Sequence, residues 1–403
     1  MTNKNLRIEQ FWEKVQDTCK EIKKIKLIYI LPLILFSPSL FFGLVADDYL
    51  HYWNLHIAQD IDAPFDSFLS MFKFIPNKQF DDTMPWWIGE GFKLWFFRPL
   101  SVLTHWFDAV LWADIFFFHH LHSLLWACLC VWGVHRLFNR LMGTKWQAVL
   151  CTLLFAVQDH HAYVNGWLAN RNANIAFFFG VLAIDTHIRN RNEKKSFFVP
   201  VSLTALSLLS AESGITTMAF IGSWALLYEK NFKATVLSLT PYVILIVVWR
   251  IIYRDMGYGT EGLTLYVDPT GSPLLYIKNI VKNIPVLLTN LWYKIPAEGL
   301  LILPRSFYTF AHVLSFVSLL PLVIFFTPVI RVNKSLQFWT LSMVVALVPV
   351  CATLPMERLL LFAGVGCIGL LVGLLQHYQG TLVKWLLVLH LPIACIMCPL
   401  KTM

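Results

Sequence analysis

Two adjacent carboxylates follow the first long apolar run of the sequence. The run extends from Leu27 to Ala46, and Asp47 and Asp48 come directly after it. A helix of about 20 apolar residues crosses the hydrocarbon core of a bilayer, so the acidic pair is predicted to lie at a membrane surface. Paired acids are costly there unless a metal, a cation or a substrate uses them. We therefore expect a functional site around Asp47 and Asp48.

Asp48 has two open roles in that site. It could hold a divalent cation such as Mg²⁺ or Mn²⁺ together with Asp47, or it could orient Arg98 or a helix end. Adjacent residues on a regular helix point about 100° apart, so both carboxylates serve one metal only if the backbone is not regular helix there. The sequence leaves metal dependence open.

The composition indicates the class of protein. The chain has 403 residues, of which 57% are hydrophobic and 14% charged, and its mean hydropathy of +0.60 is too high for a water-soluble domain of this size. We attribute the formal net charge of +8 to basic cytoplasmic loops and not to nucleic-acid binding. The cysteines lie almost wholly within apolar stretches and form no disulfide framework. A multi-pass integral membrane protein is predicted.

The apolar runs and the basic loops between them predict an all-α protein with about 11 transmembrane helices. Residues 1–26 are expected to form a cytoplasmic amphipathic segment, and residues 27–403 a single transmembrane domain. Two large outer loops are predicted at about 47–115 and 254–304, the second with an amphipathic stretch from Leu274 to Trp292. The N-terminus is expected inside and the C-terminus outside.

Further polar residues are predicted to lie on the same outer side, although they are distant in sequence. They are Arg98, Asp159, His160, His161, Arg171, Glu212, Lys294 and Arg358. Each of them taken alone could simply cap a helix or lie in a wet loop, as charges near the ends of spans usually do. Their shared sidedness favours one site on the outer face.

Five short motifs follow the acidic pair in a fixed order. They are Phe97-Arg98-Pro99-Leu100, Phe118-His119-His120-Leu121-His122, His161 with Trp167 and Arg171, Ala211-Glu212-Ser213-Gly214, and Met356-Glu357-Arg358-Leu359. In this order they resemble the GT-C glycosyltransferases over about residues 27–375. Within that superfamily, the chain is most similar to the membrane module of the TPR-containing O-mannosyltransferases, the protein mannosyltransferases and the aminoarabinose transferase of lipid A.

The resemblance implies a GT-C-like bundle that transfers a hexosyl or pentosyl group from a polyprenyl-phosphate sugar. The acceptor would be a hydroxyl of a glycan, lipid or protein on the outer face of a bacterial cytoplasmic membrane, with inversion at the anomeric carbon. Asp47 would take the proton of that hydroxyl, and Asp48 is its partner in the acidic pair. We also expect Asp159 to be a catalytic acid, from its own position and not from the resemblance, because relatives commonly carry a proline there. The implied phosphate ligands are Arg98, Arg171 and Arg358, because arginine can bind phosphate oxygens in pairs. The remaining site-shaping residues are His119, His122, His161, Glu212, Glu357 and Lys294.

The chain departs from its relatives at Tyr163, where they commonly carry a glutamate of the active site, and at Ala173, where they often carry an acid. If the segment is helical, Asp159 lies one turn before Tyr163 on the same face and could replace the missing acid. Two other functions stay open. A transporter or flippase of lipid-linked sugars would need no base, and a non-catalytic assembly partner would explain the missing acid.

Overall fold

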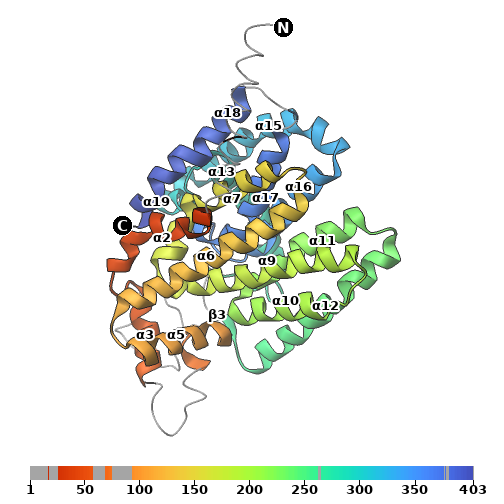
Figure 1. Cartoon of the computed structure of the whole chain (residues 1–403). Helices are drawn as coiled ribbons and strands as arrows, with labels where there is room; N and C mark the ends of the chain where they lie inside the picture. Colours follow the sequence, from red (N-terminus) through yellow and green to blue (C-terminus); the bar gives the residue numbers. More distant parts are fainter. Residues whose placement is uncertain are drawn as a thin grey trace.

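Helices make up most of the chain, and a small three-stranded sheet accompanies them (Figure 1). The computed structural model describes residues 17, 26–57, 69–74, 93–261, 265–375, 377 and 381–402. Most of the predicted amphipathic segment 1–26 and part of the first predicted outer loop therefore lie outside the described residues. The predicted all-α class is confirmed.

The α-helices follow one another along the chain with short 3₁₀ turns between some of them. They are α2 (Leu31–Leu35), α3 (Asp47–Ile57), α5 (Pro99–Trp112), α6 (Phe116–Leu141), α7 (Lys145–Ala156), α8 (Ala162–Gly166), α9 (Arg171–Asn192), α10 (Phe198–Ser210), α11 (Thr217–Tyr228), α12 (Phe232–Asp255), α13 (Pro273–Tyr293), α14 (Gly299–Ile302), α15 (Tyr308–Val332), α16 (Lys334–Val350), α17 (Leu361–Leu374), α18 (Thr381–Val388) and α19 (Ala394–Thr402). The short turns are η1 (Lys26–Ile30), η2 (Ser37–Phe41), η3 (Asp159–His161), η4 (Leu168–Asn170), η5 (Glu212–Thr216), η6 (Arg305–Phe307), η7 (Glu357–Leu359) and the π-helical η8 (Leu389–Ile393). Strands β1 (Lys73–Phe74), β2 (Lys93–Trp95) and β3 (Gly259–Glu261) pair antiparallel in that order.

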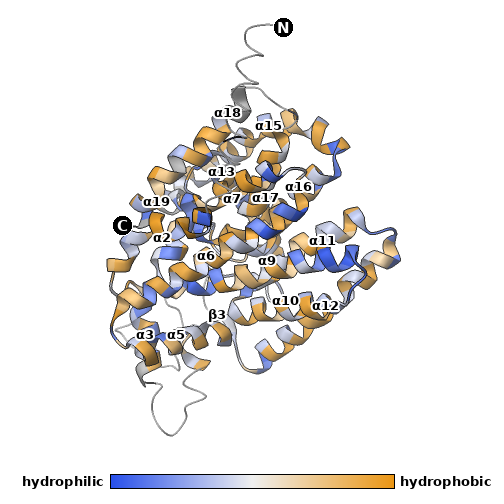
Figure 2. Ribbon diagram, in the orientation of Figure 1, coloured by the Kyte–Doolittle hydropathy of each residue, from blue (hydrophilic) through white to orange (hydrophobic). Residues whose placement is uncertain are grey.

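Three helices of the described chain are long and apolar enough to cross a membrane: α6, α12 and α15. Apolar residues dominate α12 and α15 (Figure 2), and many of them, such as Ile244, Val247 and Ile324, are exposed. Exposed apolar faces on long helices fit contact with lipid. The chain is therefore compatible with a membrane protein, but the prediction of about 11 spans is not matched, because the other apolar helices of the described chain are only 10–17 residues long.

The predicted first span does not form one helix. Residues 27–46 instead fold into η1, α2 and η2, with Pro32 and Pro38 near the starts of α2 and η2. Proline has no backbone N–H and clashes with the preceding turn, so it starts a new short helix instead of continuing a long one. The run is as apolar as a membrane-spanning helix, but Pro32 and Pro38 divide it into short helical segments.

The predicted outer loop 254–304 is also largely ordered structure. It contains β3, α13 and α14, and α13 packs on α15, α16 and α17. The expected amphipathic stretch Leu274–Trp292 corresponds closely to α13, which buries Val286, Leu287 and Leu291. The prediction that residues 254–304 form an outer loop between spans was therefore wrong, because the apolar face of α13 packs against the other helices of the bundle.

The core lies where α9 packs against α6 and α10, and where α16 packs against α17. Phe155 stacks on Phe177 with ring centroids 5.3 Å apart, and both are buried. A side chain at Gly366 would lie within 2.8 Å of Met343, so glycine permits the close approach of α17 to α16. This rigid centre supports the shorter elements at its ends.

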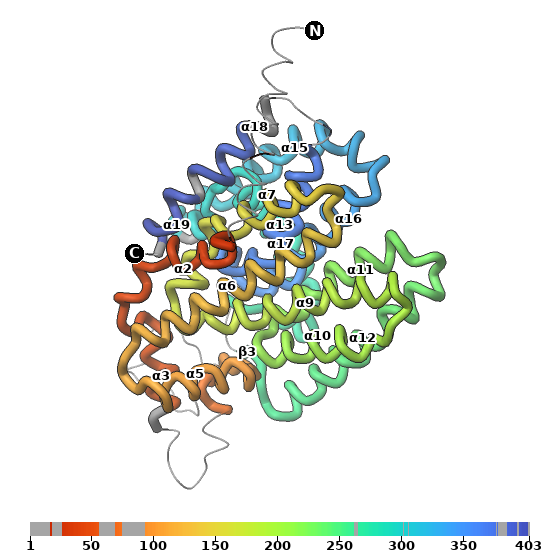
Figure 3. Tube along the Cα trace, viewed as in Figure 1, coloured from red at the N-terminus to blue at the C-terminus, as the bar shows by residue number. Residues whose placement is uncertain are grey.

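Several of those shorter elements pack on one another and hold half of the predicted site residues, namely Asp47, Asp48, Asp159, His161, Glu357 and Arg358. η4 contacts α3 and α8, and α8 and η3 both contact η7 and α19. The chain path in Figure 3 shows α3 and α5 close together beside one end of α6, with α19 on the same side of the molecule as α2. Residues that are more than 300 positions apart in the chain therefore meet around the segment between α7 and α9.

Candidate functional site

Residues 169–171 each hold a different charged side chain of the predicted site or beside it. The backbone N–H of residue 169 binds Asp48, the side-chain oxygen of residue 170 binds Arg358, and residue 171 forms an ion pair with Asp108. All three residues are at most 9% exposed. The predicted site is thus organised around the η4 turn.

Asp48 is a buried anchor in the first cluster. Its carboxylate accepts the backbone N–H of Val45 at 3.0 Å and that of Ala169 at 2.7 Å, and the residue is 2% exposed. Burial raises the pKa of Asp48 to about 6, although the two N–H groups act in the opposite direction. Both oxygens are thus occupied in tying the start of α3 to η4.

Asp47 lies at the first position of α3 and is partly exposed. Within the described part of the chain, no hydrogen bond or ion pair engages its carboxylate. Burial raises the pKa of Asp47, while the positive charges of Arg358 and Arg98 lower it. These two arginines therefore lie within electrostatic reach of an available carboxylate.

The two acids do not converge on one point. Asp47 and Asp48 belong to a regular helix, in which adjacent side chains diverge by about 100°. Ala46, just before them, has a positive φ of 48°, which marks the sharp turn into α3. No group of three or more His, Cys, Asp or Glu residues suited to a metal occurs among the described residues.

Arg358 carries a charge that no described carboxylate pairs with. Its guanidinium donates to the Asn170 oxygen at 3.1 Å and lies 5.1 Å from the ring centroid of Trp167. Trp167 in turn donates from its indole N–H to the Val45 carbonyl at 3.1 Å. Arg358 is half-buried on a rigid support, beside the same backbone that positions the acidic pair.

Arg98 is already paired. It contacts the Glu212 carboxylate at 2.8 Å and lies 4.1 Å from the ring centroid of Phe96. Glu212 also accepts the hydroxyl of Tyr253 at 3.3 Å. Pro99 begins α5 directly after Arg98, which is the position where proline suits a helix. Arg98 contributes positive charge near Asp47, but Glu212 neutralises part of it.

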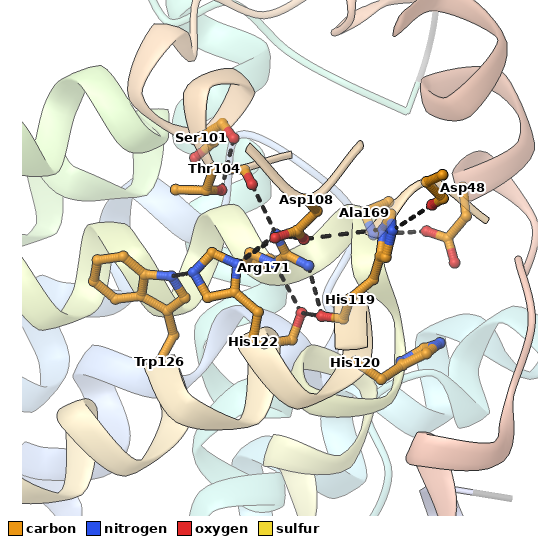
Figure 4. Close-up of polar contacts among 12 residues, drawn as sticks. Asp48, Ser101, Thr104, Asp108, His119, His120, His122, Trp126, Ala169 and Arg171 are labelled. Atoms are coloured by element: carbon orange, nitrogen blue, oxygen red, sulfur yellow. Dashed lines mark hydrogen bonds and ion pairs between the residues drawn. The ribbon is translucent and has the colours of Figure 1, made fainter. Parts of the chain in front are cut away.

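Arg171 lies at the centre of a second, fully buried cluster, which is drawn in Figure 4. Its side chain is 0% exposed, forms an ion pair with Asp108, and donates to Ser123 at 2.8 Å and to the His119 carbonyl at 2.7 Å. The predicted phosphate ligand Arg171 is therefore engaged inside the protein. It fixes α9 against α5 and α6.

His122 has a defined orientation in this cluster. Its Nδ1 lies 2.5 Å from Asp108, and its Nε2 accepts the indole N–H of Trp126 at 3.1 Å (Figure 4). The indole can only donate, so Nε2 is the acceptor and Nδ1 carries the proton toward the carboxylate. His119 binds the Ala113 carbonyl at 2.8 Å through its Nε2. His119 and His122 therefore both serve the junction of α5 and α6.

Asp159 belongs to a third cluster, where it contacts two lysines. Lys401 lies 2.7 Å from its carboxylate and Lys294 3.4 Å, and these positive charges lower the pKa of Asp159 in spite of burial. Asp159 is 4% exposed, whereas Tyr163 is 42% exposed, so the two side chains do not share the expected common face. The 3₁₀ turn η3 at Asp159 precedes α8, and this interrupts the regular helix on which that expectation depended.

The remaining predicted residues complete the third cluster. Glu357 is fully buried and binds Lys401 at 2.5 Å and Asn290 at 2.9 Å. Lys294 also donates to Gln158, and His161 packs on Phe155 with ring centroids 4.6 Å apart. The predicted site therefore divides: Asp47, Asp48, Arg98 and Arg358 gather in one place, and Arg171 and Asp159 are buried in separate ion-pair clusters beside it.

Sequence reasoning missed Asp108, Asn170 and Lys401. A lone acid within the apolar stretch 99–112 was a usable signal for Asp108, since charge inside an apolar helix needs a partner. Asn170 and Lys401 carried no comparable signal, because their roles depend on distant parts of the chain. Comparisons with protein-family models, curated proteins and solved structures found no match to this chain.

Proposed function

We propose that this chain is a membrane glycosyltransferase of GT-C type, which moves a sugar from a polyprenyl-phosphate donor to an acceptor hydroxyl on the outer face of the membrane. The observation that carries this proposal is the pairing of an available carboxylate with an available cation. Asp47 and Arg358 are both half-buried, lie within electrostatic reach of each other, and have no ion-pair partner in the described part of the chain. A base and a phosphate ligand are the two groups that this transfer needs.

The reaction follows from these two groups. The acceptor oxygen attacks the anomeric carbon while its proton passes to the Asp47 carboxylate. The bond between the anomeric carbon and the phosphate oxygen breaks, and the polyprenyl phosphate leaves with the electron pair. Arg358 stabilises the charge that grows on this phosphate, with added positive potential from Arg98. Attack from the side opposite the leaving phosphate inverts the anomeric carbon.

Asp48 and Arg171 support the site without touching the reacting atoms in this proposal. Asp48 holds the start of α3 on η4, and Arg171 holds the end of η4 on α5 and α6. The acidic pair does not fit a shared divalent cation, because the neighbouring side chains of Asp47 and Asp48 diverge by about 100° on the helix α3. We therefore derive no step through a metal.

A direct test uses the purified full chain in lipid vesicles with a panel of polyprenyl-phosphate sugars and candidate acceptors. Intact-mass measurement of the products should reveal an acceptor heavier by one sugar. Movement of the lipid-linked sugar across the vesicle membrane, without transfer of the sugar to an acceptor, would instead identify the protein as a flippase. Neither transfer nor movement with the panel, together with no binding of polyprenyl phosphate, would favour a non-catalytic partner and contradict the proposal.

Replacing Arg358 with Ala is expected to weaken binding of polyprenyl phosphate by about 10- to 100-fold, the loss of a charge-assisted contact. The measurement is the Kd of polyprenyl phosphate for the protein in nanodiscs. Lys195→Ala is the matched control, since it removes a cation whose side chain is 61% exposed and pairs with Glu193 at the surface. If Arg358→Ala and the wild type bind polyprenyl phosphate with equal affinity, Arg358 is not a ligand of the phosphate.

The acidic limb of the pH profile should lie above the ordinary range of an aspartate. Asp47 must be ionised to accept a proton, and burial raises its pKa above 3.8, so kcat/KM is expected to fall as the pH drops through that raised value. Arg358→Gln should move the limb to still higher pH, because the Arg358 charge lowers the pKa of Asp47. The profiles are measured at saturating donor, and an unmoved limb would exclude Asp47 as the titrating group.

A further inference from the structure

Lys401 joins two buried carboxylates to the helix α19. Its Nζ lies 2.5 Å from a Glu357 oxygen and 2.7 Å from an Asp159 oxygen, and its side chain is only 10% exposed. The two acids come from the separate turns η7 and η3. A single ammonium group therefore contacts a carboxylate from each turn and holds the two turns together.

The η7 turn depends on a few polar contacts. Asn290 of α13 donates to the second Glu357 oxygen at 2.9 Å, and the backbone N–H of Glu357 donates to Glu298 at 2.6 Å. In the described part of the chain, Lys401 is the cation that forms an ion pair with Glu357. Removing this cation would leave a fully buried carboxylate with a neutral amide alone, which is costly. The turn would then shift to bring Glu357 toward water.

Arg358 directly follows Glu357 in η7, so the guanidinium moves with this turn. Its contacts with Asn170 and Trp167 require the present position of η7. We propose that Lys401 is a positioning residue, which fixes η7 through Glu357 and thereby sets Arg358 for the phosphate of the lipid-linked donor. This inference rests on the proposed function, because it takes Arg358 as the phosphate ligand.

The test is the affinity of the full chain in nanodiscs for polyprenyl phosphate. Lys401→Met is expected to raise the Kd about tenfold, which corresponds to one misplaced charge-assisted contact. Lys401→Arg should restore most of the affinity, since a guanidinium keeps the charge between the two acids. Rescue by arginine distinguishes a charge-dependent role from simple packing.

The control removes a cation from another buried acid. Arg140 and Arg136 both pair with Asp185, which is 0% exposed, so Arg140→Met leaves that carboxylate with one partner. Asp185 lies 14 residues (185 − 171) beyond Arg171 on α9, about 21 Å away along the helix. Arg140→Met should leave the Kd unchanged. Equal losses in Lys401→Met and Arg140→Met would reduce the effect to general destabilisation and overturn the inference.

A second variant keeps the test decisive if Lys401→Met does not fold. Lys401→Met with Glu357→Gln removes both buried charges at once, and it should bind no more weakly than Glu357→Gln alone, because Lys401 acts through Glu357. Weaker binding of polyprenyl phosphate by the double variant than by Glu357→Gln alone would contradict the proposal that Lys401 acts through Glu357. If Arg358→Ala weakens binding but Lys401→Met does not, this inference fails alone. If Arg358→Ala also binds normally, the proposed phosphate site fails.

Discussion

Asp47→Asn should lower kcat for sugar transfer by about 10²- to 10⁴-fold, the usual contribution of a general base. The amide is nearly the same size as the carboxylate but cannot take the acceptor proton. No described residue forms a hydrogen bond or ion pair with the Asp47 carboxylate, so the substitution breaks no such contact in the described part of the chain and the fold should persist. The Kd of polyprenyl phosphate should stay within about twofold of the wild type, because a general base acts in the transition state and contributes little to binding of the donor.

Asp114→Asn is a suitable control for this experiment. Asp114 also lies near α3, where it accepts the hydroxyl of Tyr52, but it takes no part in the proposed chemistry. Its kcat should remain close to that of the wild type. Transfer at the normal rate by Asp47→Asn would contradict the assignment of the base. If the wild type and Asp47→Asn both move lipid-linked sugar across the membrane at the normal rate and neither transfers it to an acceptor, the result would favour a transporter.

Arg171→Leu should cost about 3–5 kcal/mol of stability, because it leaves Asp108 charged and buried without its cation. Both side chains are 0% exposed, and Arg171 also binds Ser123 and the His119 carbonyl. The free energy of unfolding in detergent micelles, measured with denaturant, tests this expectation. The effect is large because one substitution disturbs the contacts between α9, α5 and α6 together.

A double variant separates stability from ligand binding at this position. Arg171→Leu with Asp108→Leu removes both charges and should recover a large part of the lost stability, as apolar replacements of buried ion pairs often do. Polyprenyl phosphate should then bind to the double variant nearly as well as to the wild type. Recovered stability without recovered binding would return Arg171 to the role of phosphate ligand.

The long apolar helices could be predicted from the sequence. Long apolar runs of the sequence coincide with α6, α12 and α15, and hydropathy alone is enough to locate these three helices. The first run failed as a span because Pro32 and Pro38 restart the helix, a local effect that a hydropathy average does not register. The second outer loop failed because an amphipathic helix can pack on protein as well as lie at a surface.

The site could be predicted in part. Placing Asp47 and Arg358 on one side required only the sidedness of charge, and the structure brings them within electrostatic reach. Which arginine stays available depends on pairing with acids from other helices. Asp108 takes Arg171 and Glu212 takes Arg98, and both pairings are tertiary contacts that spacing along the chain does not encode. The choice among the three arginines therefore needed coordinates.

The three contacts made by residues 169–171 also constrain how the protein can vary in length. Residues 169 and 170 lie in the 3₁₀ turn η4, in which each residue is rotated by about 120° from the one before, and Arg171 begins α9. One inserted residue between Trp167 and Arg171 would therefore change how the groups that face Asp48, Arg358 and Asp108 are placed relative to one another. No single compensating substitution could restore all three. Natural and engineered versions of this protein should therefore keep the length of this segment, and a change of residue type should be tolerated best at residue 169, whose contact with Asp48 is made by the backbone.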